Sequence, residues 1–260
     1  MVKMITLPIA LEMIGLIVLC LAVTITIFFF IRKKFTHEKV SENHTIASYI
    51  FNAFSISYGV LLAFVVYANW YDNNRAHQNV AYEVSYISNF YRDTRTLQDS
   101  LKKIITGELI NYTKSVLEDE WFCLSEGKSS TKTDTLLDNL WNSYLNIPAD
   151  KIPNQQLFQV SLERLNYISQ YRRLRILDMQ QTTPGVMWVV LAVCFSVSLA
   201  YAYFFMTKQR KAHLLLVITF IIINTLIFYL IYVLDHPYRF NSGISSEPFR
   251  TVLNKISTGK

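Results

Sequence analysis

Polar and small side chains recur at helical spacing inside one apolar stretch of this 260-residue chain. The stretch runs from Ile46 to Trp70 and exceeds the length of about 20 apolar residues that a membrane-spanning helix needs. At about 100° per residue, Asn52, Ser55, Gly59 and Ala63 share one face of that helix. Small residues allow a second helix to approach closely, whereas a polar face turned to the axis of an oligomer meets water and ions. The pattern leaves helix packing and pore lining both open.

Four further polar side chains lie in or near apolar segments, where burying a polar group without a hydrogen-bond or ion-pair partner is unfavourable. Arg172 and Arg175 are three residues apart and share one helix face, either as exposed or headgroup-binding side chains or as buried side chains with an ion-pairing or anion-attracting role. Asn224 lies near the middle of a later apolar run, where an amide needs partners across a helix interface. Asp235 ends that run. An ionisable group is much cheaper there than at mid-span, so Asp235 is also compatible with a plain helix end.

Motifs for catalysis, nucleotide binding and metal binding are absent from the sequence. No glycine-rich phosphate loop occurs, and seven glycines are scattered over the chain. The five histidines fall in separate segments without the spacing of a zinc site. Cys20 and Cys194 lie in apolar runs and Cys123 stands alone in the polar middle, so no disulfide framework is indicated. We therefore expect neither an enzyme, nor a cofactor, nor a metal site.

The elements that position these groups are predicted to be membrane-spanning helices. Hydrophobic residues make up 52% of the chain and charged residues only 17%, which is typical of a membrane protein. Four apolar runs without Lys or Arg are long enough to span a bilayer: Ile5 to Ile31, Ile46 to Trp70, Val186 to Met206, and Leu214 to Leu234. The first run lacks a small-residue cleavage site and is followed directly by basic residues. It is interpreted as an uncleaved signal-anchor.

A nearly neutral polar segment separates the second and third spans. From Asp72 to Asp178 it carries 13 basic and 14 acidic residues, and its apolar residues recur at helical spacing. We predict an all-α membrane protein in which a helical-bundle domain, residues 71–183, lies between two transmembrane hairpins, residues 1–70 and 184–235, with a tail at 236–260. Because residues 69–91 contain no Gly or Pro, the second span should continue unbroken into the domain.

The basic residues indicate an orientation in the membrane. The two short loops that follow the first and third spans carry seven Lys and Arg residues: Arg32, Lys33, Lys34, Lys39, Lys208, Arg210 and Lys211. The positive-inside rule places these loops in the cytoplasm and the helical domain on the other side of the membrane. The arginines that precede the third span, among them Arg172, Arg173 and Arg175, argue for the opposite orientation.

Several short motifs between about Ile50 and Val252 resemble those of bacterial membrane proteins known as bestrophin-like. They are LLAF at Leu61 to Phe64, AYEV at Ala81 to Val84, RRLR to PGVMW at Arg172 to Trp188, and LDHPYRFNSGISSEP at Leu234 to Pro248. The resemblance marks Glu83, in AYEV, as a further polar residue of interest. Relatives often have Gly where this chain has Ala63, which weakens any role there that needs a bare backbone.

The resemblance implies an ion channel similar to the pentameric bestrophins. Bestrophins keep their large domain in the cytosol, which is opposite to the orientation that the charges predict. We expect an oligomeric ion channel or permeation pathway with the second span lining the pore. The alternative is a non-conducting, membrane-anchored scaffold or sensor that binds a protein partner through its helical domain. Expected partners are the lipid bilayer, further copies of the chain and, for a channel, inorganic ions, but not nucleic acid.

Overall fold

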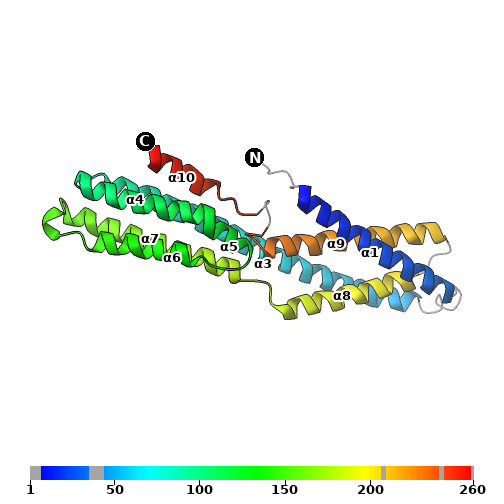
Figure 1. Cartoon of the computed structure of the whole chain (residues 1–260). Coiled ribbons are helices and arrows are strands. Elements are labelled where there is room, and N and C mark those ends of the chain that lie inside the picture. Colours follow the sequence, from blue (N-terminus) through cyan, green and yellow to red (C-terminus); the bar gives the residue numbers. More distant parts are fainter. Residues whose placement is uncertain (1–6, 35–43, 206–208, 240–242, 259–260) are drawn as a thin grey trace. The chain divides into compact units, whose positions relative to one another are not determined.

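Long apolar runs and scarce helix breakers produce long helices in the computed structural model. It describes residues 7–34, 44–205, 209–239 and 243–258, and every regular element within these ranges is a helix (Figure 1). The chain divides into two compact units, which are described separately. One comprises residues 1–71 and 182–235, and the other comprises residues 72–181 and 236–260.

The first unit contains four helices that are long and apolar enough to cross a membrane. They are α1 (Leu7–Lys34), the N-terminal part of α3 (His44–Thr94), α8 (Gly185–Phe204) and α9 (Arg210–Asp235). Large apolar side chains such as Phe30, Phe64 and Val186 are exposed on them, as expected for helices that face lipid. The predicted all-α fold with four spans is confirmed, although Ile5 and Met206, at the ends of two predicted spans, lie outside the described residues.

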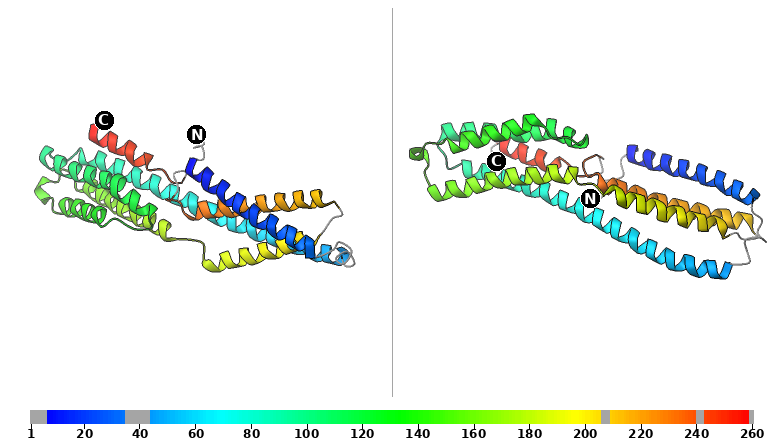
Figure 2. Two further views of the ribbon diagram at one scale, coloured as in Figure 1. Left: turned by 45° about the vertical axis from the view of Figure 1, so that its right-hand side comes forward. Right: turned by 90° about the horizontal axis from the view of Figure 1, so that it is seen from below.

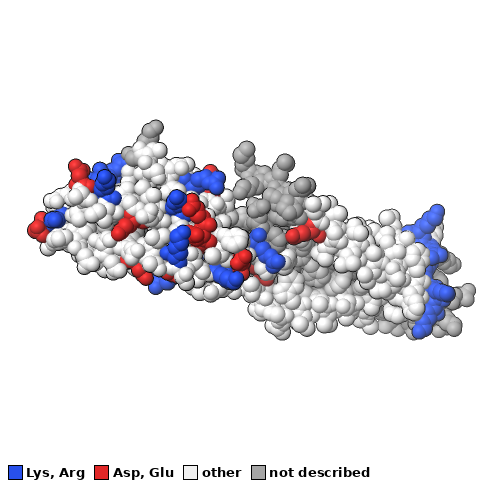
Figure 3. Space-filling view, viewed as in Figure 1, with Lys and Arg blue, Asp and Glu red and all other residues white. Residues whose placement is uncertain are grey.

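Packing inside this membrane unit joins three of the helices. Tyr58, Leu62 and Val65 of α3 form a buried cluster with Leu191 of α8 and Ile231 of α9. The visible face of the unit is almost free of charged residues, and basic side chains gather at the end that lies on the right in this view (Figure 3). The unit therefore combines an apolar surface with a small internal core, the arrangement expected of a membrane-embedded helical bundle.

Helix α3 runs without interruption for 51 residues, from His44 to Thr94 (Figure 2). The predicted continuation of the second span into the polar segment is therefore confirmed. At the other end of that segment the chain does break. Helix α7 (Gln155–Gln180) ends four residues before Pro184, and α8 begins directly after this proline, which disfavours a helical conformation in the residue that precedes it.

The second unit is a helical domain built around one apolar core. Its helices are the C-terminal part of α3, α4 (Asp99–Ser115), the π-helical turn η2 (Val116–Glu120), α5 (Trp121–Ser125), α6 (Thr131–Leu145), the short 3-10 helix η3 (Ala149–Lys151), α7 and α10 (Glu247–Thr258). Helix α10 lies in the segment that the sequence analysis assigned to a tail. Its apolar residues Phe249, Val252 and Ile256 are buried in the domain core, and their spacing of three and four residues was the overlooked signal.

Candidate functional site

The face of α3 that carries the small and polar residues is uncovered in the single chain. Asn52, Gly59 and Ala63 are exposed, and Ser55 is half-buried. A Cβ atom added at Gly59 would meet no atom within 4 Å. An apolar groove of about 570 Å³ borders the face and is lined by Gly59, Leu62, Ala63, Val66, Tyr67 and Trp70 of α3 and by Ile227 and Leu230 of α9. Within the described part of the chain, no helix packs over Gly59.

Asn224 lies inside the membrane unit and not on this face. The Tyr58 hydroxyl donates a hydrogen bond of 2.9 Å to Asn224 Oδ1, and Asn224 Nδ2 donates to the backbone carbonyl oxygen of Phe220. Both side chains are buried. The amide thus has partners on its own helix and on α3, as expected for a polar group in apolar surroundings.

Asp235 connects the end of α9 to the start of α8. Its Oδ1 accepts a hydrogen bond from the backbone N–H of Thr183, and the Thr183 hydroxyl lies 2.7 Å from the same atom. That hydroxyl also lies 2.9 Å from Asn69 Oδ1 of α3, and its single proton is donated to one of the two oxygens. Asp235 is 7% exposed. Its carboxylate therefore does more than end a helix, because it satisfies backbone and side-chain groups of the link that precedes α8.

Arg175 occupies the centre of a buried ion-pair cluster in the helical domain. Arg175 Nε donates to Glu83 Oε2 at 2.8 Å, and Nη2 donates to Glu120 Oε2 at 2.8 Å. The Tyr112 hydroxyl donates to Glu83 Oε1 at 2.7 Å. The carbon centre of the guanidinium lies 5.3 Å from the ring centroid of Phe249. One charged group thus holds α3, η2 and α7 together.

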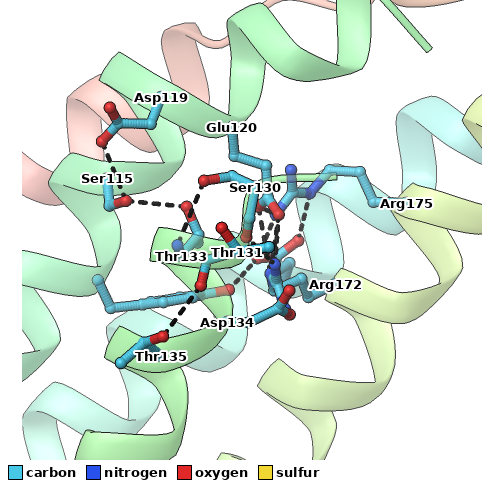
Figure 4. A network of polar contacts seen from close by, with 12 residues as sticks. Ser115, Asp119, Glu120, Ser130, Thr131, Thr133, Asp134, Thr135, Arg172 and Arg175 are labelled. Carbon is cyan, nitrogen blue, oxygen red and sulfur yellow. Dashed lines mark hydrogen bonds and ion pairs between the residues drawn. The ribbon is translucent and has the colours of Figure 1, made fainter. Parts of the chain in front are cut away.

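Arg172 extends the cluster by one helical turn along α7 (Figure 4). Its Nε donates to Glu120 Oε1 at 3.0 Å, and Nη1 pairs with Asp134 of α6. Nη2 also reaches the backbone carbonyl oxygen of Ser130 at 3.4 Å. Arg172 is 4% exposed, and Arg175, Glu83 and Glu120 are fully buried. Both arginines are therefore buried and paired with carboxylates, and neither is an exposed side chain.

The electrostatics of the cluster favour its charged form. Burial raises the pKa of Glu120, but the positive charges of Arg175 and Arg172 outweigh burial and hold the pKa of this carboxyl below its ordinary value. Burial, together with the charge of Glu83, raises the pKa of the Tyr112 phenol well above its usual range. Tyr112 therefore stays protonated and donates its hydrogen bond, whereas Glu120 stays ionised.

Sequence reasoning missed three members of the cluster: Tyr112, Glu120 and Asp134. The arginines gave a visible signal through their spacing, but no local pattern singles out one carboxylate of the run Glu118, Asp119 and Glu120. The π-helical turn that ends at Glu120 is a rare element that often accompanies functional sites. No group of three or more metal-ligating side chains is found in the ranges that the structure describes.

The predicted site residues thus fall into separate groups. Glu83, Arg172 and Arg175 belong to the buried cluster of the helical domain, and Asn224 and Asp235 belong to internal contacts of the membrane unit. Asn52, Ser55, Gly59 and Ala63 form the uncovered face of α3. The cluster has the character of a structural brace.

Comparisons with known proteins identify the family. A family model described as a bestrophin-like domain matches residues 18–249. The fold is similar to that of two variants of a bacterial bestrophin homologue from Klebsiella pneumoniae. One is 11% identical, with a TM-score of 0.68 over 95% of this chain and 99% of that chain. The other is 13% identical, with a TM-score of 0.70 over 96% of each chain.

A further solved structure, described as a membrane protein, is 11% identical and has a TM-score of 0.70 over 95% of this chain and 98% of that chain. No curated protein sequence matches the chain. At such low identities the solved structures establish a common fold, whereas the family model covers most of the sequence. The chain is a multi-pass membrane protein that belongs to the bestrophin-like family.

Proposed function

We propose that the protein is an oligomeric ion channel or permeation pathway of the bacterial inner membrane, and that α3 lines its pore. Membership of the bestrophin-like family and the four apolar helices support this proposal. The observation that carries it is the uncovered face of α3 at Asn52, Ser55, Gly59 and Ala63. A single copy would turn this face to lipid.

Asn52 gives the strongest reason why the face should not contact lipid. Its side chain is exposed and forms no hydrogen bond within the part of the chain that the structure describes. An amide in hydrocarbon without partners is costly. In a ring of copies with α3 at the centre, Asn52 meets water, and the bare backbone at Gly59 leaves room for ions or for a neighbouring helix.

The proposal is tested by ion flux from liposomes that contain the purified protein. Gly59→Leu adds a branched side chain to the proposed pore wall, and we expect it to abolish most of the flux. Val60→Leu is the matched control, because Val60 is also exposed and lies about 100° away around α3. Equal flux in the wild-type protein and Gly59→Leu would overturn the assignment of α3 to the pore.

The oligomeric state and ion conduction together separate the channel from its alternative. The mass of the protein in mild detergent should correspond to several copies, because one copy of α3 cannot enclose a pore. A stable oligomer that conducts no ion tested would instead support the membrane-anchored scaffold. In that case the α3 face would serve as a dry contact between helices.

A further inference from the structure

The uncovered face of α3 continues beyond the apolar run and carries a histidine. His77 follows Gly59 by 18 residues, which corresponds to about five complete turns at about 3.6 residues per turn. The two residues therefore lie on the same line along the helix, about 27 Å apart. Since α3 is one unbroken helix from His44 to Thr94, its own periodicity establishes this relation.

Around His77 this face is also free of packing. Asn74, His77 and Ala81 are exposed, whereas Val80 and Ala76, about 60° and 100° from His77 around α3, are buried in the core of the helical domain. Within the helical domain, α3 therefore buries Ala76 and Val80 and leaves Asn74, His77 and Ala81 exposed.

Between Asn52 and Ser88, His77 is the only ionisable residue that lies within about 60° of Gly59 when the angle is measured around the axis of α3. Among the described residues, none forms a hydrogen bond or ion pair with its imidazole. The nearest charged groups along α3 are Asp72 and Arg75. Arg75 pairs with Asp72 at 3.2 Å and with Asp178 of α7, the helix packed against this part of α3, at 3.5 Å. These neighbours therefore form their own ion pairs.

We propose that His77 of every copy faces the central axis of the oligomer and makes ion selectivity depend on pH. The inference rests on the proposed channel function and assigns a regulatory group to the same α3 face. Neutral imidazoles contribute no net charge to the pathway. Protonated imidazoles form a ring of positive charges, which attracts anions and opposes cations.

The experiment measures the chloride-to-sodium permeability ratio of the reconstituted protein between about pH 8 and about pH 5.5, a range that extends well below 6.5 because burial lowers the pKa of the His77 imidazole from its ordinary value of about 6.5. We expect the ratio to rise several-fold as the pH falls. His77→Ala should remove most of this rise and leave the ratio at high pH close to that of the wild-type protein.

Placing the histidine at other positions of α3 tests whether the pH dependence requires an imidazole that faces the oligomer axis or is a general effect of substituting residue 77. In the His77→Ala background, Ala81→His restores an imidazole one turn further on and about 40° from the line, and the pH dependence should return. Gln78→His places the same group about 100° away on an exposed position, and the pH dependence should stay lost. Elution as the wild-type oligomer establishes that each variant is folded.

The outcomes separate the two proposals. If the wild-type protein carries no ions, the channel function fails and this inference fails with it. If the protein conducts but the His77→Ala variant retains the full pH dependence, only the role of His77 is overturned. Restoration by Gln78→His as well as by Ala81→His would also overturn it, because the effect would then not depend on facing the axis.

Discussion

At the residue scale, the charged side chains buried in the helical domain destabilise the fold unless each has a partner of opposite charge. Arg175 is fully buried and relies on Glu83 and Glu120 to balance its charge. Replacing a whole buried ion pair by apolar residues is often neutral, whereas removing one partner leaves an uncompensated charge. The cluster therefore specifies how α3, η2 and α7 meet more than it adds net stability.

Glu83→Ala should consequently lower the free energy of unfolding by about 3 to 5 kcal/mol, because it removes one of the two carboxylates that balance the buried charge of Arg175. Thermal unfolding of the purified protein, followed by circular dichroism, measures the effect. The control is Glu118→Ala, which removes the exposed i,i+4 pair with Lys114 and should change stability by about 1 kcal/mol or less. Similar losses in the two variants would contradict a bracing role for the cluster.

The lowered pKa of the Glu120 carboxyl predicts how the stability of the helical domain depends on pH. Against the effect of burial, Arg175 and Arg172 lower the pKa of Glu120 in the folded protein below its unfolded value, which is about 4.3. Its contribution is fully present above that value and is lost as the pH falls through the folded pKa. Glu120→Gln should therefore lower the melting temperature most at neutral pH, with a difference from the wild-type protein that narrows below about pH 4.3. A difference that is constant with pH would contradict this origin.

At the scale of elements, local pattern predicted the long helices but not the contacts that join them. The spans and the unbroken α3 follow from apolar runs without helix breakers, which act within one segment. The partners of Arg175 lie 92 residues away at Glu83 and 55 residues away at Glu120, and no local pattern encodes such pairs.

Helix α10 offers a test of how firmly the C-terminal segment belongs to the domain. Phe249 is fully buried, and its ring centroid lies 5.8 Å from that of Trp121. Phe249→Ala should lower the stability of the domain by about 3 to 5 kcal/mol through the cavity it creates. The neighbouring Arg250→Ala, at an exposed position, should stay within about 0.5 kcal/mol of the wild-type protein. Equal melting temperatures would mean that α10 is only loosely attached.

At the scale of the whole molecule, the distribution of Lys and Arg predicts which side of the membrane holds the helical domain. The positive-inside rule counts Lys and Arg in short loops, whereas segments longer than about 60 residues cross largely regardless of charge. The seven basic residues of the two short loops therefore weigh more than the arginines of the long segment from Tyr71 to Pro184, although Lys39 and Lys208 lie outside the described residues. On this argument we propose that the domain is extracytoplasmic.

Cysteine labelling in intact cells tests this orientation. Gln156→Cys places a thiol on an exposed position of α7, next to Asn154, whose side chain caps the helix and is left in place. With Cys20, Cys123 and Cys194 replaced, an impermeant thiol reagent should label Gln156→Cys without lysis. Lys33→Cys, at the exposed C-terminal end of α1, should react only after the membrane is opened.

The reverse pattern would place the domain in the cytoplasm and the basic loops outside. The positive-inside rule would then have failed for this chain.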